Sequence, residues 1–128
     1  MNCLDTNIII DFWRGDLDII SRMDEIKSEP LFITPVTLCE LYRGAYLSSL
    51  QEKNLNLIRE LLLRMEVADF TAEACEIFGM EYAKARKIRK LRHEPDLMIA
   101  SIAKAHGLTM VTRNRKHFEN MDIRVDVW

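Results

Sequence analysis

The chain alternates short apolar runs with longer segments in which apolar residues recur at helical spacing. The apolar runs predict strands at residues 2–4, 31–33, 66–69, 108–112 and 123–127. Strands that alternate with helices are typical of βαβ units, in which the strands run parallel. The pattern therefore predicts an α/β fold, a three-layer α/β/α sandwich with a central, mostly parallel sheet of about five strands.

The segments between these strands contain the signals that start and end helices. They predict helices at residues 8–14, 16–28, 35–48, 50–65, 72–92 and 94–107, with a helical turn at 115–120. Thr34 and Thr71 are expected as N-caps, because a threonine hydroxyl can accept a hydrogen bond from the first helical turn. Gly107 is expected just beyond the end of its helix, where a positive φ is common.

Length and composition favour a single domain over residues 1–128. The chain has 128 residues, 48% of them hydrophobic, which is enough for one core. Its apolar runs are far shorter than the roughly 20 residues that cross a bilayer. No basic segment followed by an apolar one stands at the start, so we expect no signal peptide and a cytoplasmic protein. The net charge of −2 gives no overall attraction to nucleic acid.

Cysteines and histidines form no familiar metal or disulfide motif. The three cysteines are far apart and are interpreted as small core residues: Cys3, Cys39 and Cys75. The spacing of His93, His106 and His117 is not that of a zinc site. The sequence therefore gives no support for a zinc centre or a disulfide framework.

Three carboxylates from distant parts of the chain, Asp5, Glu40 and Asp96, could meet at one edge of the sheet. Asp5 follows the first predicted strand, and Asp96 begins the helix that leads into the fourth. Open parallel sheets bind ligands outside the carboxyl ends of their strands. Carboxylates brought together repel one another unless protons or cations neutralise them. Because Mg²⁺ and Mn²⁺ favour oxygen ligands, the set predicts a divalent metal site.

Each acid also has an ordinary structural interpretation. Asp5, followed by Thr6 and Asn7, could simply cap the next helix. Asp96 would be favoured near a helix start by the helix dipole alone. Glu40 could lie on a solvated helix surface, although its apolar neighbours indicate a largely buried helix. Taken one at a time, the acids leave both interpretations open.

Four segments in a fixed order make the chemistry more specific. They are residues 4–11 (LDTNIIID), 34–44 (TPVTLCELYRG), 96–103 (DLMIASIA) and 111–114 (VTRN). Together they resemble a PIN domain, in particular the VapC-type toxins of bacterial and archaeal toxin–antitoxin pairs. The resemblance covers nearly the whole chain.

The resemblance implies an endoribonuclease that depends on Mg²⁺ or Mn²⁺ and hydrolyses RNA phosphodiester bonds. It implies that Asp5, Glu40 and Asp96 are the catalytic, metal-binding acids. It also implies supporting residues in the same site, namely Thr6, Asn7, Thr112 and Asn114. A homodimer is a further implication, as is a cognate antitoxin that packs on the early helices and covers the acidic site.

The last of the four segments departs from the family pattern. Many members have a further acid there, where this chain has Asn114 and, just before Phe118, His117. An amide oxygen can still ligate a metal or bind a metal's water. Whether one or two metals bind, and whether Asn114 or His117 replaces the acid, therefore stays open.

A basic stretch before Asp96 offers a place for RNA. The residues predicted to contact RNA are Arg86, Arg89, Lys90 and Arg92, with Arg113 and Arg115 near the last motif. Such cations would neutralise phosphates and make binding salt-dependent. The alternative is a solvated helix end whose charges favour the negative pole of the helix dipole. Which RNA is cut stays open, because the backbone is common to all of them.

Two other functions stay open. The missing acid suits a catalytically weakened PIN-like protein that acts through protein partners. A small-molecule phosphatase with Asp5 as nucleophile is a further alternative, although the haloacid-dehalogenase pattern wants an acid where this chain has Asn7. The absence of a glycine-rich phosphate motif from the sequence argues against a nucleotide-binding Rossmann or P-loop protein.

Overall fold

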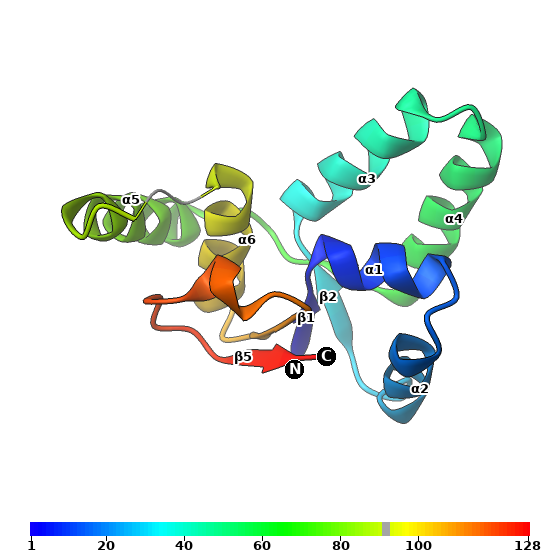
Figure 1. Cartoon of the computed structure of the whole chain (residues 1–128), viewed down its shortest axis with the longest axis horizontal. Helices are drawn as coiled ribbons and strands as arrows, with labels where there is room; N and C mark the ends of the chain where they lie inside the picture. Colours follow the sequence, from blue (N-terminus) through cyan, green and yellow to red (C-terminus); the bar gives the residue numbers. More distant parts are fainter. Residues whose placement is uncertain (91–92) are drawn as a thin grey trace.

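The computed structural model describes residues 1–90 and 93–128 and has a five-stranded sheet at its centre (Figure 1). The strands are β1 (Asn2–Leu4), β2 (Leu31–Ile33), β3 (Glu66–Val67), β4 (Thr109–Thr112) and β5 (Val125–Val127). Neighbouring strands all pair in parallel, in the order β3-β2-β1-β4-β5. The predicted α/β/α sandwich around a parallel sheet is confirmed.

Helices fill the connections between the strands. They are α1 (Thr6–Trp13), α2 (Leu17–Glu25), α3 (Pro35–Leu47), α4 (Gln51–Arg64), α5 (Ala72–Lys87), α6 (Glu94–Ala105) and a short 3₁₀ helix, η1 (Arg115–Phe118). As predicted, Thr34 and Thr71 are the N-caps of α3 and α5, and each hydroxyl accepts a hydrogen bond from a first-turn backbone N–H. In the described residues, no helix is long and apolar enough to span a membrane.

Alternating side chains on the strands bury both faces of the sheet. Leu4, Ile33 and Val111 pack on one face, against residues of α1, α2, α3 and α4. Cys3 and Met110 pack on the other face, against α5 and α6. Figure 1 shows the same division of the helices into two layers. Because successive strand residues point to opposite faces, even strands of three or four residues contribute to both cores.

Two helices end earlier than predicted. α2 ends at Glu25, where the backbone N–H of the C-cap residue Ile26 donates to the Met23 carbonyl at 3.3 Å, the i−3 bond of a tight turn in place of the i−4 bond of an α-helix. α5 ends at Lys87, and beyond it Arg89 has a φ of 54°, outside the right-handed helical region. The predicted end of this helix at Arg92 lies outside the described residues.

The interpretation of all three cysteines as core residues is wrong for two of them. Cys3 on β1 is buried, and burial raises the pKa of its thiol to about 12. Cys39 on α3 and Cys75 on α5 are exposed. Both helices pack with one face only, and the apolar character of cysteine does not indicate which face it occupies.

Candidate active site

The candidate site lies where the sheet changes direction between β1 and β4. From β1 the chain adds β2 and β3 on one side, whereas β4 and β5 lie on the other side. Ligands bind open parallel sheets at such a point, outside the carboxyl ends of the strands. Asp5 directly follows β1, and its backbone N–H donates to the Val111 carbonyl at 2.8 Å. Thr112 ends β4, so the first and last motifs meet here.

Asp5 is a buried carboxylate, with 3% of its surface exposed. Its Oδ1 accepts a hydrogen bond from the Thr6 backbone N–H at 2.8 Å, and its Oδ2 accepts one from the Thr112 hydroxyl at 2.7 Å. Burial raises the pKa of Asp5 above its ordinary value and outweighs these two bonds, which lower it. The negative charge of Asp96 adds to the rise. A cation beside Asp5 would remove this penalty.

Glu40 reaches the site from α3 and is held by a hydroxyl group. Its Oε1 accepts a hydrogen bond from Thr6 Oγ1 at 2.8 Å. The same hydroxyl lies 3.1 Å from Oγ1 of Thr37, a buried residue one turn earlier on α3. Thr6 therefore contacts two of the predicted acids, Asp5 through its backbone and Glu40 through its side chain.

Asp96 lies in the first turn of α6 beside two histidines. Its Oδ2 is 3.6 Å from Nδ1 of His93, the N-cap residue of α6. It is 3.5 Å from Nδ1 of His117, which comes from η1. When protonated, either imidazole would balance the charge of this carboxylate.

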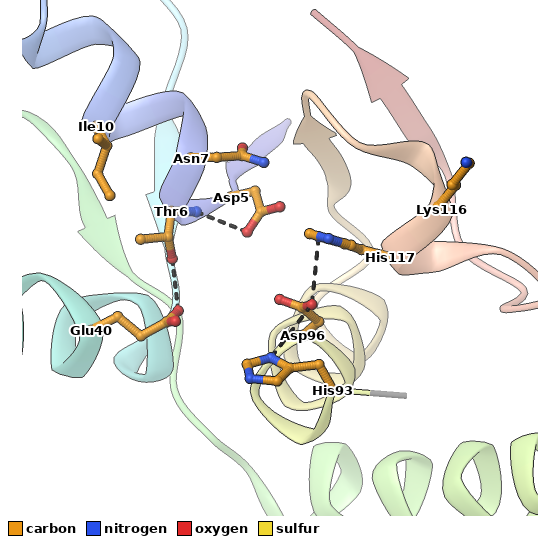
Figure 2. A pocket seen from close by; sticks show the side chains of 9 residues that line it. All are labelled: Asp5, Thr6, Asn7, Ile10, Glu40, His93, Asp96, Lys116 and His117. Carbon is orange, nitrogen blue, oxygen red and sulfur yellow. Dashed lines mark hydrogen bonds and ion pairs between the residues drawn. The ribbon is translucent and has the colours of Figure 1, made fainter. Parts of the chain in front are cut away.

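These side chains surround one cavity of about 530 Å³ (Figure 2). It is lined by Asp5, Thr6, Asn7, Ile10, Glu40, His93, Asp96, Lys116 and His117. Figure 2 shows Glu40 on one side, Asp96 and the histidines on the other, and Asp5 between them. The structure thus brings the three predicted acids around one space.

The donor atoms of the cavity fit a hard divalent cation. Most are oxygens, and the buried Asn7 Oδ1 has no hydrogen-bond partner among the residues that the structure describes. Within residues 1–90 and 93–128, no three His, Cys, Asp or Glu side chains form a group that could hold a metal ion. Mg²⁺ commonly keeps several waters and takes one or two carboxylates, so direct contact with all three acids is not required.

Comparison with known proteins assigns the chain to a family. A model described as PIN domain matches residues 3–124. The chain belongs to the PIN domain family. Its relatives include "Ribonuclease VapC2" of Haemophilus influenzae, which is 34% identical over 98% of this chain and 96% of that protein. Another is "tRNA(fMet)-specific endonuclease VapC" of Shigella flexneri, 32% identical over 98% of this chain and 96% of that protein.

A solved structure agrees with this PIN domain in fold as well as in sequence. It is a DNA-bound VapBC complex from Salmonella typhimurium, with a TM-score of 0.90 and 32% identity. The alignment covers 99% of this chain and 97% of that chain. The resemblance to VapC-type proteins that the four motifs predicted is therefore confirmed.

In the last motif of this PIN domain, His117 lines the cavity and Asn114 supports it. Asn114 caps η1, because its Oδ1 accepts a hydrogen bond from the Lys116 backbone N–H at 3.1 Å. This orientation turns the amide nitrogen toward Nε2 of His117, at 2.9 Å. Since an amide nitrogen only donates, Nε2 accepts, and a neutral His117 carries its proton on Nδ1, which faces Asp96.

The predicted RNA-binding cations of this PIN domain differ in their surroundings. Arg86, Arg89 and Arg115 are exposed. Lys90 is also exposed and lies 4.0 Å from Glu119, which follows η1. The end of α5 is thereby close to η1. The prediction for Arg92 falls outside the described residues.

Arg113 binds two carboxylates of its own chain. Its Nη1 lies 3.0 Å from Asp11 Oδ2 and 2.7 Å from Asp16 Oδ2. Both hydrogen bonds raise the pKa of Arg113, and the bond to Asp16 has the larger effect. The bond between Arg113 and Asp16 also lowers the pKa of Asp16. Asp16 also caps α2 by accepting from the Ile19 backbone N–H at 3.1 Å. Arg113 therefore fastens the segment after β4 to the start of α2.

Two residues of the cavity, Ile10 and His93, were not among the residues predicted for the site. His93 has a usable signal, because it stands three residues before Asp96 and such residues share one side of a helical turn. Lys116 belongs, with Arg113 and Arg115, to the basic group near Asn114 that the sequence offers for RNA. Asp5 does cap α1, so the structural interpretation that the sequence left open is compatible with a role in the site.

Proposed function

We propose that this chain is a metal-dependent endoribonuclease, the toxin of a toxin–antitoxin pair, that hydrolyses RNA phosphodiester bonds with Mg²⁺ or Mn²⁺. The main support is the buried Asp5 carboxylate, whose pKa is raised, in a cavity that Glu40 and Asp96 also line. Membership of the PIN domain family, with relatives named as VapC ribonucleases, supports the reaction class. Residues 1–128 would form one nuclease domain that acts on RNA in the cytoplasm.

The side chains of the cavity divide the work. A divalent ion held by Asp5 and Asp96 would supply positive charge beside the attacked phosphate and acidify water there. The Thr112 hydroxyl fixes the orientation of Asp5, and the Thr6 hydroxyl fixes Glu40. These contacts keep the carboxylate oxygens in place before substrate binds, which reduces the cost of ordering them later.

His117 takes the place of the further acid in this proposal. It lies beside Asp96 and is oriented by Asn114, as a histidine or carboxylate in the outer shell of a metal site orients a ligand. Asn7 Oδ1 offers a further oxygen to an ion or its water.

Cations at the end of α5 and on η1 would hold the RNA backbone. Lys116 lines the cavity itself, and Arg86, Arg89 and Arg115 are exposed on the two neighbouring elements. Single-stranded RNA bound in this way would be released by salt. The Shigella flexneri relative is named as specific for tRNA(fMet), so transfer RNA is the first substrate to test.

A cognate antitoxin is the partner of this chain, as the VapBC complexes among its solved relatives support. A groove of about 640 Å³ between α1, α2 and α4 suits one face of an antitoxin helix. Phe12, Trp13, Met23 and Leu57 contribute to its apolar lining. We infer that the antitoxin helix packs in this groove, called here the antitoxin groove, and that the following segment covers the acidic cavity.

A homodimer is the second assembly that we infer, from the family resemblance. Light scattering on the purified chain should then report twice the mass of one chain, which is 15.0 kDa. A monomer at micromolar concentration would contradict this inference.

Cleavage of a transfer RNA in Mg²⁺, Mn²⁺ or EDTA tests the nuclease proposal. Asp5→Asn, Glu40→Gln and Asp96→Asn should each abolish most of the cleavage, and EDTA should abolish all of it. Asp18→Asn, an exposed acid on α2, is the matched control and should cleave as the unaltered chain does. Cleavage without metal, or undiminished cleavage in all three variants, would contradict the mechanism. Phosphate release from a small phosphoester would favour a phosphatase.

A further inference from the structure

The cavity of about 530 Å³ around the three acids is called here the active-site cavity. A second cavity adjoins it on the side of Glu40. It has a volume of about 380 Å³, lies between α1, α3 and α4, and shares Ile10 and Glu40 with the active-site cavity. Figure 2 shows these two residues on the side opposite Asp96 and His117. A chain bound across the acids could therefore continue into this second cavity, called here the flanking cavity.

The lining of the flanking cavity combines an apolar wall with cations. Its apolar members include Trp13, Leu41 and Ile58, and its polar members include Arg14 and Lys53. Within residues 1–90 and 93–128, neither cation forms an ion pair with a carboxylate. Small-molecule sites are typically of this kind, largely apolar with a few polar groups, and upward of about 300 Å³ in volume.

The flanking cavity shares Trp13 and Leu57 with the antitoxin groove but differs from it in charge. The antitoxin groove is lined by Asp24, Glu29 and Glu60 together with two cations, so its charges are mixed. The flanking cavity has Arg14 and Lys53 and a single acid, Glu40, at its boundary with the active-site cavity. A polyanion with flat apolar groups fits this arrangement better than a peptide does.

We propose that the flanking cavity binds a nucleotide next to the cleaved phosphodiester, with its base against Trp13 and its phosphate near Arg14 and Lys53. The proposal rests on the proposed endoribonuclease function. Base stacking on an aromatic side chain and phosphate contacts by cations are the general means of binding single strands. Together with the cations of α5 and η1 on the opposite side, this subsite would hold the strand on both sides of the acids.

Salt-dependent RNA binding tests the phosphate contact without relying on cleavage. An Asp5→Asn chain, made inactive, is titrated with a fluorescent oligoribonucleotide at several salt concentrations. Adding Arg14→Gln or Lys53→Gln should lower the slope of log affinity against log salt by about 0.7, the value for one phosphate contact on a single strand. Arg59→Gln, a cation on α4 outside both cavities, is the control and should leave the slope unchanged. Unchanged slopes in both test variants would overturn the proposal.

Substrate length tests the nucleotide itself. Shortening an oligoribonucleotide by the flanking nucleotide should lower kcat/KM of the otherwise unaltered chain about 10-fold, within the range for one stacked base. The Arg14→Gln/Lys53→Gln double variant should lose much less on the same shortening, because part of the subsite is already gone. An equal loss in both proteins would overturn the proposal.

The two experiments separate failure of this proposal from failure of the nuclease proposal. Altered slopes, together with no cleavage by the chain that retains Asp5, would support RNA binding at Arg14 and Lys53 and contradict the nuclease proposal alone. Unaltered slopes in a chain that cuts RNA would contradict the subsite alone. Unaltered slopes combined with weaker binding of an antitoxin peptide would assign the flanking cavity to the protein partner and overturn the proposal.

Discussion

Asp5 occupies a position that is unfavourable for a carboxylate without a cation. Burial and the charge of Asp96 raise its pKa, although two hydrogen bonds hold the ionised form. Asn7 Oδ1, buried nearby without a hydrogen-bond partner in the described part of the chain, adds to the same imbalance. On the proposed function, a cation bound beside Asp5 would relieve this imbalance and stabilise the folded chain.

Thermal unfolding with and without metal tests this role of Asp5. Saturating Mn²⁺ should stabilise the unaltered chain by about 2.7 kcal/mol when its concentration is 100 times the Kd. Asp5→Asn removes a ligand and a repulsive charge, so its melting temperature in EDTA should equal or exceed that of the unaltered chain, and Mn²⁺ should not raise it. An equal shift in both proteins would show that the ion binds elsewhere.

The pH dependence of stability in EDTA should have a sign opposite to the usual one for an aspartate. Because the pKa of Asp5 is raised in the folded state, the folded chain retains a proton that the unfolded chain loses. The contribution of Asp5 should fall as pH rises from its ordinary pKa, about 3.9, through its raised value. Denaturant unfolding of the unaltered chain and of Asp5→Asn across this range gives the difference, and a difference independent of pH would contradict the expectation.

Thr112→Val isolates the hydroxyl that orients Asp5. The variant keeps the size of the side chain but loses the hydrogen bond to Asp5 Oδ2 and the acceptor of the Asn114 backbone N–H. Cleavage should fall by about 10- to 100-fold, the usual cost of removing a group that orients a metal ligand. Thr109→Val, at the other end of β4, is the control and should retain full activity. Equal activity of the two variants would contradict an orienting role.

At the scale of elements, the ion pairs of Arg113 join two segments that are far apart in the sequence. Asp11 and Asp16 precede it by 102 and 97 residues. On either side of Arg113, the chain supplies Thr112 to Asp5 and Asn114 to His117. Fastening the segment between β4 and η1 to the start of α2 therefore also positions two contacts of the candidate site.

Arg113→Met should lower kcat by about 10-fold and change KM for RNA little, since it loosens supporting residues but removes no substrate contact. If Arg113 instead binds phosphate, as the sequence alone predicted, the variant should raise KM and weaken the salt dependence of binding. Steady-state cleavage at two salt concentrations distinguishes these outcomes. Arg22→Met, paired with an exposed acid on α2, is the control and should alter neither constant.

The sequence predicts which strands and helices are present better than it predicts the residues at which they end. The strands and helices exist because their apolar positions must be buried, and that pattern is visible in the chain. Their ends depend on single backbone conformations. The positive φ of Arg89, for example, ends the turn after α5, although arginine at this position gives no signal for it.

For the candidate site, the sequence likewise predicts which residues meet but not which partner each side chain contacts. Asp5 and Thr112 meet because parallel strands align their carboxyl ends, and order along the chain is sufficient to predict that. The partners of each side chain depend on distances that the sequence does not contain. Glu40 contacts the Thr6 hydroxyl, and Arg113 binds Asp11 and Asp16, whereas the sequence suggested a free cation for RNA.

For the whole molecule, the antitoxin groove and the active-site cavity are lined by separate residues. Met23→Glu, within the groove, should weaken antitoxin binding at least 10-fold, because it places a charge against an apolar helix face, and should leave RNA cleavage unchanged. Leu63→Glu, on a side chain with 87% of its surface exposed, is the control and should alter neither. Calorimetry with an antitoxin peptide measures the affinity, and equal affinities would contradict the location of the groove.

The hydrogen bond between Asp5 and Thr112 joins residues that are 107 positions apart. β1 also has no partner on that side until β4 has been synthesised. During translation, the first acid of the site therefore emerges from the ribosome long before the strand that completes its surroundings. A toxin built in this order has no assembled nuclease site of its own while most of its message is still being read.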